Sequence, residues 1–311
     1  MILTVTPNVA LDITYRVDQL TPGLSHRVRS VEERAGGKGV NVARALHALG
    51  HDTFVLGLVG GATAGAITTD LARGGLAHAL VVVEGPTRRS IAVVDARNHE
   101  ATLFNEPGPR VAATSWSDLE ARLAARLPEA TALVVSGSLP PGAGDDACAR
   151  LVRMAAAHRV AVLVDAVGEA LLQAAAAGAD IVKLNSGELR QTTGRSDVAA
   201  AATALRRRGA KAVVVSLGAA GMTAFAPEGS WRAATPAPVV GNPTGSGDAA
   251  AAAIIAGAVA GAPWPDRLRD AVALSAAAVL QPTAGSVDLR DYLQLVPQIL
   301  VEEHHAPGLD R

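Results

Sequence analysis

Gly241-Asn242-Pro243-Thr244-Gly245-Ser246-Gly247-Asp248 is followed by an alanine-rich run that extends to Ala262. Proline and glycine are unfavourable inside a helix and alanine favours one, so this stretch predicts a tight turn leading directly into a helix. The first N–H groups of a helix have no partner within it, and together with the positive helix end they can bind an anion. Gly245 and Gly247 would let that anion approach closely.

Asp248 falls in the first turn of the predicted helix. A carboxylate at that position favours the helix dipole, so ordinary capping could explain it. Beside a bound anion, however, it would be repelled unless it has a chemical role such as accepting a proton. An anion site with a base at its edge suits phosphoryl transfer to a hydroxyl group. From this stretch alone, both interpretations stay open.

The composition limits the class of protein. The 311 residues are 49% hydrophobic, enough for a sizeable core in one large or two unequal domains. A balance of 28 Lys+Arg against 29 Asp+Glu does not indicate a nucleic-acid or membrane-surface partner. With one cysteine, Cys148, the chain forms no intramolecular disulfide and no multi-cysteine metal site. Because no signal peptide and no spanning segment is evident, we expect a cytoplasmic protein.

From about residue 115, predicted helices alternate with short apolar strands, and this order favours a mostly parallel sheet with helices on both faces. Helices are expected at 115–127, 145–157, 168–177 and 197–208, and strands at 132–136, 160–165, 181–184 and 212–217. Further short strands are expected near 222–226, 231–234 and 237–240, and helices at about 247–261 and 267–280. Polar residues follow several strands, at the edge where such a sheet builds its site: Ser136, Asp165, Asn185 and Ser216.

Two segments, 12–35 and 87–108, depart from this order. Both alternate apolar and polar residues, the pattern of a strand with one solvated face. They predict a small antiparallel sheet whose other face is covered by the ligand cleft, a second subunit, or both. We therefore divide the chain into an α/β core (1–11, 36–86 and 109–300), a small sheet (12–35 and 87–108) and a flexible tail (301–311).

Three other places could contact a ligand. Asp12 follows the first strand, although a lone aspartate there is also common as a turn residue. The run Gly36-Gly37-Lys38-Gly39 precedes a helix and is either a ligand loop or a flexible turn. It lacks the downstream Ser/Thr of a Walker P-loop, and no Gly-x-Gly-x-x-Gly of a dinucleotide-binding oxidoreductase follows the first strand. Arg88 and Arg89 could bind an anionic group or lie at a solvated strand end.

Five motifs occur in a fixed order along the chain. They are Gly36–Ala43, Ser136–Gly142, Lys183–Leu189, Val215–Gly221 and Gly245–Asp248. In this order they resemble the ribokinase-like sugar kinases of the phosphofructokinase B family, over about residues 1–295. Five ordered motifs are far more specific than one, and the resemblance favours the ligand-binding interpretation of the glycine turns.

The resemblance also indicates a subgroup. Thr6–Asp12, His26–Val28 and Thr87-Arg88 are similar to the tagatose/fructose phosphokinases, and Asn242–Asp248 leans toward the tagatose 6-phosphate branch. The implied activity is ATP-dependent phosphorylation of tagatose 6-phosphate or fructose 1-phosphate, and less readily of fructose 6-phosphate, to the bisphosphate. Ser25 stands where some fructose 6-phosphate kinases carry a phosphate-binding lysine, which weakens that third assignment.

The roles implied by the resemblance divide the site into three parts. Asp248 would be the base, and the N–H groups of Gly245, Ser246 and Gly247 would stabilise the transferring phosphoryl group. The expected sugar contacts are Asp12, Gly37, Lys38 and Asn41, with Arg88, Arg27 and Ser138 near the sugar phosphate. The expected contacts to ATP and Mg²⁺ are Lys183, Asn185 and Glu188, with Glu188 acting through metal-bound water, and Ser216, Gly218 and Gly221 along the nucleotide.

By the same resemblance, the small sheet is a lid over the sugar that pairs with a second lid in a homodimer. Two departures touch the nucleotide side: Leu184 replaces a usual proline, and Asp165-Ala166-Val167-Gly168 lacks the common hydroxyl residues. Two alternatives stay open, a kinase for an unphosphorylated sugar or nucleoside and a non-catalytic sugar-phosphate binding protein. The sequence leaves undecided the preferred phosphosugar, the hydroxyl that reacts, the oligomeric state, the nucleotide preference and control by ATP.

Overall fold

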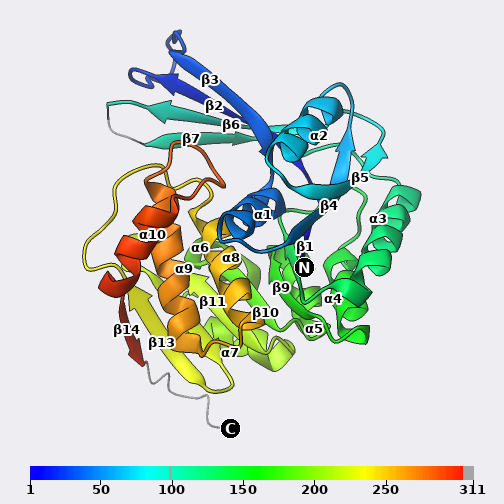
Figure 1. Cartoon of the computed structure of the whole chain (residues 1–311), viewed down its shortest axis with the longest axis vertical. Helices are drawn as coiled ribbons and strands as arrows, with labels where there is room; N and C mark the ends of the chain where they lie inside the picture. Colours follow the sequence, from blue (N-terminus) through cyan, green and yellow to red (C-terminus); the bar gives the residue numbers. More distant parts are fainter. Residues whose placement is uncertain (98–99, 304–311) are drawn as a thin grey trace.

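The computed structural model describes residues 1–97 and 100–303. In this part of the chain, a ten-stranded sheet has the order β14-β13-β12-β11-β10-β9-β8-β1-β4-β5, with helices on both faces (Figure 1). Its strands are β1 Ile2–Thr6, β4 Thr53–Gly60, β5 Ala77–Val83, β8 Ala132–Ser136, β9 Ala161–Asp165, β10 Ile181–Asn185, β11 Ala212–Ser216, β12 Met222–Ala226, β13 Gly229–Ala234 and β14 Leu300–Glu303.

The helices cover both faces of this sheet. One hydrophobic cluster packs α3, α4, α5 and α7 on one face, and a second packs α1, α8 and α9 on the other. The helices are α1 Lys38–Ala48, α2 Ala64–Arg73, α3 Ala113–Arg126, α4 Ala147–Ala157, α5 Gly168–Ala176, α6 Ser186–Thr193, α7 Val198–Arg208, α8 Ser246–Val259, α9 Trp264–Val279 and α10 Leu289–Leu295. Short 3₁₀ turns occur at Leu127–Glu129, Gly218–Ala220 and Val296–Gln298.

Strand direction follows the connections. From β5 to β11 every pairing is parallel, because helices return the chain to the same end of the sheet. Strands β12, β13 and β14 are antiparallel, and β12 joins β13 through the two residues Pro227-Glu228. The polar carboxyl ends of the parallel strands therefore lie along one edge of the sheet, as the sequence predicts.

A second sheet projects from this edge and corresponds to the predicted lid. Its strands are β2 Ala10–Val17, β3 Ser30–Gly36, β6 Arg88–Asp95 and β7 Ala101–Asn105, in the order β3-β2-β6-β7. The outer pairings are antiparallel, whereas the central strands β2 and β6 run parallel because the chain passes through the core between them. In this register, Asp12 lies opposite Arg34 on β3 and Ser90 on β6.

Two expectations about the chain are wrong. Residues 237–240 form no strand, because Pro236 and Pro238 flank or interrupt them and donate no hydrogen bond to a sheet. Residues 301–303 are not a tail: they belong to β14, which pairs with the exposed edge of β13. An unpaired strand edge is a template for such a partner. Residues 304–311 of the predicted tail lie outside the described residues.

The alanine-rich helix α8 is a core element. Nine of its residues, from Asp248 to Ala256, are buried, and it packs closely against α9 and α1. Among the described residues, no helix combines the length and the apolar character needed to cross a membrane. The apolar run after the Gly245–Asp248 turn therefore fixes the start of α8 against the centre of the molecule.

Candidate active site

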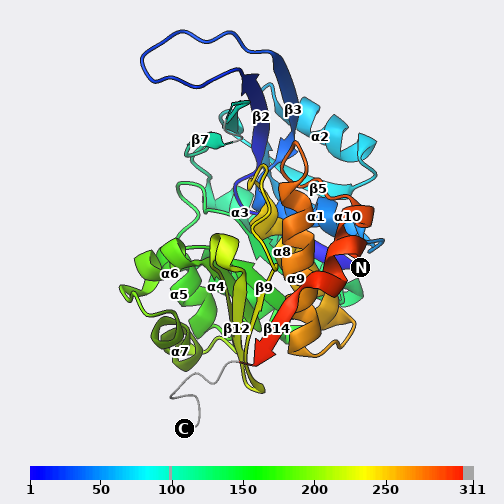
Figure 2. The same ribbon diagram turned by 90° about the vertical axis from the view of Figure 1, so that its left-hand side faces the viewer.

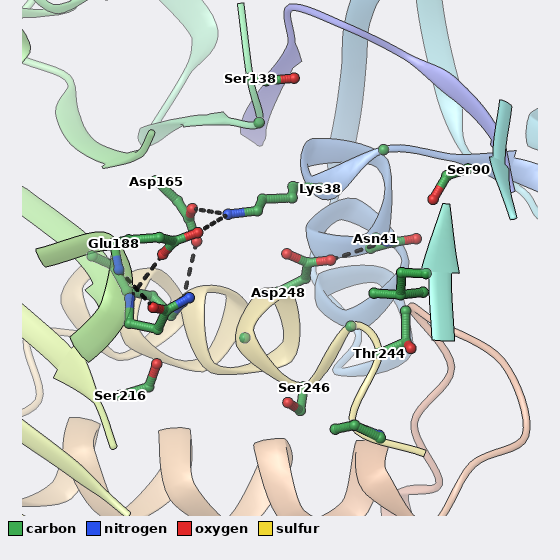
Figure 3. Close-up of a pocket in the computed structure, with 18 of the residues that line it drawn as sticks. Lys38, Asn41, Ser90, Ser138, Asp165, Glu188, Ser216, Thr244, Ser246 and Asp248 are labelled. Atoms are coloured by element: carbon green, nitrogen blue, oxygen red, sulfur yellow. Dashed lines mark hydrogen bonds and ion pairs between the residues drawn. The ribbon is translucent and has the colours of Figure 1, made fainter. Parts of the chain in front are cut away.

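A cleft of about 1410 Å³ lies between the lid and the carboxyl ends of the core strands. Figure 3 shows its centre, where Lys38, Asp165, Glu188, Asn41 and Asp248 converge. All predicted site residues but one line the cleft. Those that line it are Asp12, Gly37, Lys38, Asn41, Arg88, Ser138, Lys183, Asn185, Glu188, Ser216, Gly218, Gly221, Gly245, Ser246, Gly247 and Asp248.

Arg27 is the exception. It is exposed and does not line the cleft, because it belongs to the segment between β2 and β3 that extends beyond the lid strands (Figure 2). Within one chain, Arg27 therefore lies apart from the other expected contacts to the sugar phosphate, and its role stays a prediction.

The turn before α8 offers free backbone donors. Gly245 adopts a left-handed conformation with φ of 82°, and the helix begins at Ser246. The Ser246 N–H donates to the carbonyl of Pro243 (3.2 Å) and the Asp248 N–H to that of Gly245 (3.0 Å). Among the described residues, the N–H groups of Gly245 and Gly247 have no hydrogen-bond acceptor. The anion site thus has these two donors, and the expected third, at Ser246, is already engaged.

Lys183 adds a positive charge beside this turn. A methyl group in place of the Gly247 hydrogen would lie 3.3 Å from Lys183 Nζ, so the glycine leaves room for the ammonium. Lys183 is 3% exposed. Two free N–H groups, a helix N-terminus and a buried ammonium are suited to the terminal phosphates of a nucleotide.

Asp248 is buried at the centre of the cleft. Its Oδ2 accepts a hydrogen bond from Asn41 Nδ2 at 3.0 Å. Burial raises the pKa of this carboxyl to about 7 and Asp165 adds to the rise, while Lys38, Asn41 and Lys183 limit it. A carboxylate that titrates near neutral pH can accept a proton from a hydroxyl more effectively than one titrating near 4.

Asp12 occupies the lid side of the same cluster. Burial raises its pKa to about 6, against the opposing effects of Arg88, the Gly37 N–H, Arg34 and the Asn41 amide. Asn41 therefore lies between the two carboxyls of Asp12 and Asp248, one on the lid and one on the core. A sugar hydroxyl held between them would have an acceptor on each side.

Two lysines and two carboxylates form the opposite wall. Lys38 Nζ donates to Asp165 Oδ1 (2.8 Å) and Glu188 Oε1 (3.2 Å), and Lys183 Nζ donates to Asp165 Oδ2 (3.1 Å). Burial disfavours the Asp165 carboxylate, but Lys183 and Lys38 outweigh it and hold the pKa of Asp165 below its usual range. Burial likewise disfavours the Lys38 ammonium, and the carboxylates of Asp165 and Glu188 keep its pKa above its usual range.

Asp165 was named among the polar residues at the site edge of the sheet, but no role was predicted for it. Its position at the end of strand β9 was the available signal, since strand ends supply the site in such sheets. Lys38, which the resemblance assigns to the sugar, is bound on the Asp165–Glu188 side in this structure. The ammonium thus lies between the sugar and nucleotide regions.

Asn185 and Glu188 form a capping box at the start of α6. The Asn185 Oδ1 accepts the Glu188 N–H (2.8 Å), and Glu188 Oε2 accepts the Asn185 N–H (2.8 Å). Since both carboxylate oxygens of Glu188 have donors, contact with a cation through water fits better than direct ligation. No group of three metal-ligating side chains occurs within residues 1–97 and 100–303.

The lid end of the cleft contains a further network. Arg88 Nε donates to the carbonyl of Asn8 (3.1 Å), and Asn8 Nδ2 donates to Ser138 Oγ (3.2 Å) and to the carbonyl of Pro107 (3.0 Å). Arg89 does not line the cleft, and its side chain binds Glu106, a half-buried residue at the rim of the cleft. Strand alternation therefore separates the two arginines, and Arg88 alone lines the cleft.

The far end is lined by small and apolar side chains. Ser216, Gly218 and Gly221 line the cleft there, and a methyl group at Gly221 would lie 2.0 Å from the carbonyl oxygen of Ala233. The sequence analysis did not identify seven further residues that line the cleft: Thr235, Val239, Val240, Val272, Ser275, Ala276 and Val279. Valine and alanine in a core helix or loop carry no functional signal of their own.

The chain resembles known proteins in both sequence and fold. The model of the pfkB family of carbohydrate kinases matches residues 5–290. The chain is 36% identical to 1-phosphofructokinase of Rhodobacter capsulatus over 288 residues, 89% of this chain and 90% of that protein. It is 29% identical to tagatose-6-phosphate kinase of Staphylococcus epidermidis over 311 residues, 97% of this chain and 100% of that protein.

Among solved structures, phosphofructokinase-2 from Escherichia coli in complex with substrates and products matches with a TM-score of 0.87 at 30% identity, covering 95% of this chain and 98% of that one. The tetrameric inhibited form of the same Escherichia coli protein matches with a TM-score of 0.85 at 29% identity, with the same coverage.

Proposed function

The chain belongs to the pfkB family of carbohydrate kinases, and we propose that it transfers the terminal phosphoryl group of ATP to a hydroxyl of a ketohexose phosphate. The observation that carries the proposal is the position of Asp248. This buried carboxyl, with its pKa raised to about 7, lies at the N-terminus of α8 between the Asn41–Asp12 side of the cleft and Lys183.

The residues divide the chemical step among them. Asp248 removes the proton of the attacking hydroxyl as the oxygen–phosphorus bond forms and the bond from phosphorus to the ADP oxygen breaks. Asn41 orients Asp248 through the 3.0 Å hydrogen bond, and Asp12 holds a neighbouring sugar hydroxyl. The free N–H groups of Gly245 and Gly247, with the Lys183 ammonium, stabilise the negative charge on the transferring group.

ATP and Mg²⁺ fit the residues present. Lys38 and Lys183 offset the phosphates, and Ser216, Gly218 and Gly221 border the nucleoside groove. Magnesium in such sites keeps several waters and takes few protein ligands, which agrees with a Glu188 that already binds Lys38 and the Asn185 N–H. Bound there, the ion would neutralise charge on the phosphates that Asn185 and Glu188 face.

A phosphorylated sugar is favoured by the lid end of the cleft. Arg88 supplies a guanidinium there, with Ser138 Oγ held nearby through Asn8. A neutral sugar needs no such cation, whereas a phosphate gains charge-assisted hydrogen bonds from it. Fructose 1-phosphate and tagatose 6-phosphate remain the two candidates, with fructose 6-phosphate third. The higher identity to a 1-phosphofructokinase supports fructose 1-phosphate as the substrate to test first.

We also propose a homodimer through the lid. Five large apolar side chains on the lid are between 41% and 67% exposed: Leu24, Val28, Val31, Leu103 and Phe104. Large apolar side chains left exposed on one small sheet commonly mark an interface. Sedimentation of the wild type against Phe104→Asp tests it, and a monomeric wild type at micromolar concentration would contradict the dimer.

The deciding experiment is an initial-rate comparison with MgATP and fructose 1-phosphate, tagatose 6-phosphate, fructose 6-phosphate or free fructose. We expect one phosphosugar to have the highest kcat/KM. In Arg88→Ala, the KM for that sugar should rise by a factor corresponding to roughly 1.5–3 kcal/mol. Arg89→Ala, which removes the neighbouring arginine that does not line the cleft, is the matched control and should leave KM nearly unchanged.

Two other outcomes would favour a different function. Turnover of free fructose or a nucleoside, with no effect of Arg88→Ala, would favour a kinase for an unphosphorylated substrate. Binding of a phosphosugar without turnover, equal in the wild type and in Asp248→Asn, would favour a non-catalytic binding protein.

A further inference from the structure

The loop between α9 and α10, residues 281–286, joins the lid to the catalytic turn. It rises from the core toward the lid strands in both views (Figures 1 and 2). Arg34 Nη1, from lid strand β3, donates to Thr283 Oγ1 (2.9 Å) and Ser286 Oγ (2.8 Å). Arg16 Nη2, from β2, donates to the carbonyl of Pro282 (3.3 Å). Two lid strands thus hold one loop of the core.

The other side of this loop lies against the catalytic turn. A methyl group in place of the Gly245 hydrogen would lie 2.8 Å from the Gly285 nitrogen and 3.0 Å from the Ala284 Cα. A methyl group at Gly285 would lie 2.7 Å from Asn41 Oδ1. Asn41 in turn donates to Asp248. Such close packing leaves the loop little room to shift without displacing either the turn or Asn41.

Arg34 is the lid residue best placed to fix the loop. Its side chain is half-buried, and its strand position is opposite Asp12. The two hydroxyls that it binds, Thr283 and Ser286, bracket Ala284 and Gly285, the two residues packed on Gly245. A planar guanidinium can hold two acceptors in fixed geometry, which an ammonium on a flexible stem cannot do as well.

We propose that Arg34 is a positioning residue for phosphoryl transfer: from the lid, its guanidinium presses loop 281–286 against Gly245 and Asn41, and so sets the geometry of the anion site and of Asp248. This inference rests on the proposed function. Arg34 contacts no reacting atom in this arrangement. Through this contact, the position of the lid determines the position of the catalytic turn. The donors of the anion site therefore reach their catalytic geometry only when the lid lies over the cleft.

Kinetics test the positioning role. In Arg34→Ala we expect kcat to fall roughly 10- to 100-fold, because a displaced catalytic group loses near-attack geometry, while the KM for MgATP stays nearly constant. Arg34→Lys should recover only part of the loss. Arg150→Ala is the matched control. Arg150 also binds two acceptors, Glu120 and Asp146, but it belongs to α4 and does not line the cleft. It should lose thermal stability and keep kcat.

A double-mutant cycle identifies the contact. Thr283→Val with Ser286→Ala removes both acceptors of Arg34 and should lower kcat as Arg34→Ala does. The variant with all three changes should be no slower than Arg34→Ala, because the contact can be lost only once. An unchanged kcat in Arg34→Ala, or losses that multiply in the combined variant, would overturn the proposal.

Hydrogen exchange provides a readout that does not require turnover. In Arg34→Ala, peptides covering 241–250 and 281–287 should exchange faster than in the wild type, and in Arg150→Ala they should not. If the wild type turns over none of the tested sugars, the proposed function fails, while the exchange result still decides whether Arg34 orders the turn. Unchanged exchange in both peptides would refute the positioning role by itself.

Discussion

Replacing Asp248 by asparagine should abolish most turnover and at the same time stabilise the fold. The side chain keeps its shape and can still accept the Asn41 hydrogen bond, but it loses the negative charge. General-base catalysis contributes about 10²- to 10⁴-fold in rate, and kcat should fall within that range. The gain in stability follows from burial, which makes the charged carboxylate unfavourable in the folded protein.

The size of that gain can be worked from the pKa. Asp248 titrates at about 7 in place of 3.8, and each step of one in pKa corresponds to 1.36 kcal/mol, or about 4 kcal/mol in all. The folded state keeps the proton between these pH values while the unfolded state has lost it. The wild type therefore loses stability as pH rises from about 3.8 to 7, and the asparagine variant does not.

Thermal unfolding of both proteins from pH 5 to pH 8 measures this difference. With 311 residues at about 2.1 cal/mol/K each, the unfolding entropy is roughly 0.65 kcal/mol/K. The full effect then corresponds to about 6 °C in Tm, of which about 4 °C develops between pH 5 and pH 7. The variant should gain on the wild type as pH rises and level off above about pH 7. Asp118→Asn, at an exposed position on α3, controls for the loss of one charge.

Two results would refute the reasoning. A Tm difference that does not change between pH 5 and pH 8 would mean that Asp248 does not titrate in this range. Turnover of Asp248→Asn close to that of the wild type would mean that another group removes the proton. The same pKa predicts that kcat/KM of the wild type falls as pH drops below about 7, because the protonated carboxyl cannot act as a base.

Three more changes test other parts of the site. Lys183→Met leaves Asp165 with one ammonium partner in a buried site, and we expect a loss of about 3–5 kcal/mol in urea unfolding; a loss under 1 kcal/mol would contradict a tight buried pair. Gly36→Ala should prevent normal folding or sugar binding, because its methyl group would lie 2.0 Å from the Asp12 carboxyl; calorimetric binding close to that of the wild type would show that the strand can move aside. Glu188→Gln should raise the Mg²⁺ concentration needed for half-maximal rate several-fold, and an unchanged magnesium titration would remove Glu188 from the cation site.

The sequence determined those features that depend on neighbouring residues. The Gly245–Asp248 turn and the capping box of Asn185 and Glu188 each lie within four residues, so local backbone preferences favour both. The alternation of strands and helices predicted the large sheet and the edge at which the site forms. Sequence patterns failed for short segments. The strand expected at 237–240 is absent, and helices α6 and α10 were not expected. Segments this brief contain too few residues to show a clear period.

Only the tertiary structure decided which distant side chains meet. Lys38 and Asp165 are 127 positions apart, Asn41 and Asp248 are 207, and Arg34 and Thr283 are 249. Their contacts depend on the order of strands in the two sheets and on the parallel pairing of β2 with β6, which no local pattern encodes.

The position of Arg27 is another feature that only the tertiary structure decided. Arg27 carries a charge suited to a phosphate, but the segment that bears it leads away from the cleft. The identity of a residue determines which chemical groups its side chain offers, but not where that side chain lies in the fold. The raised pKa of Asp248 and the buried pairing of Lys183 with Asp165 arise only when folding removes water from around them and brings the charges together.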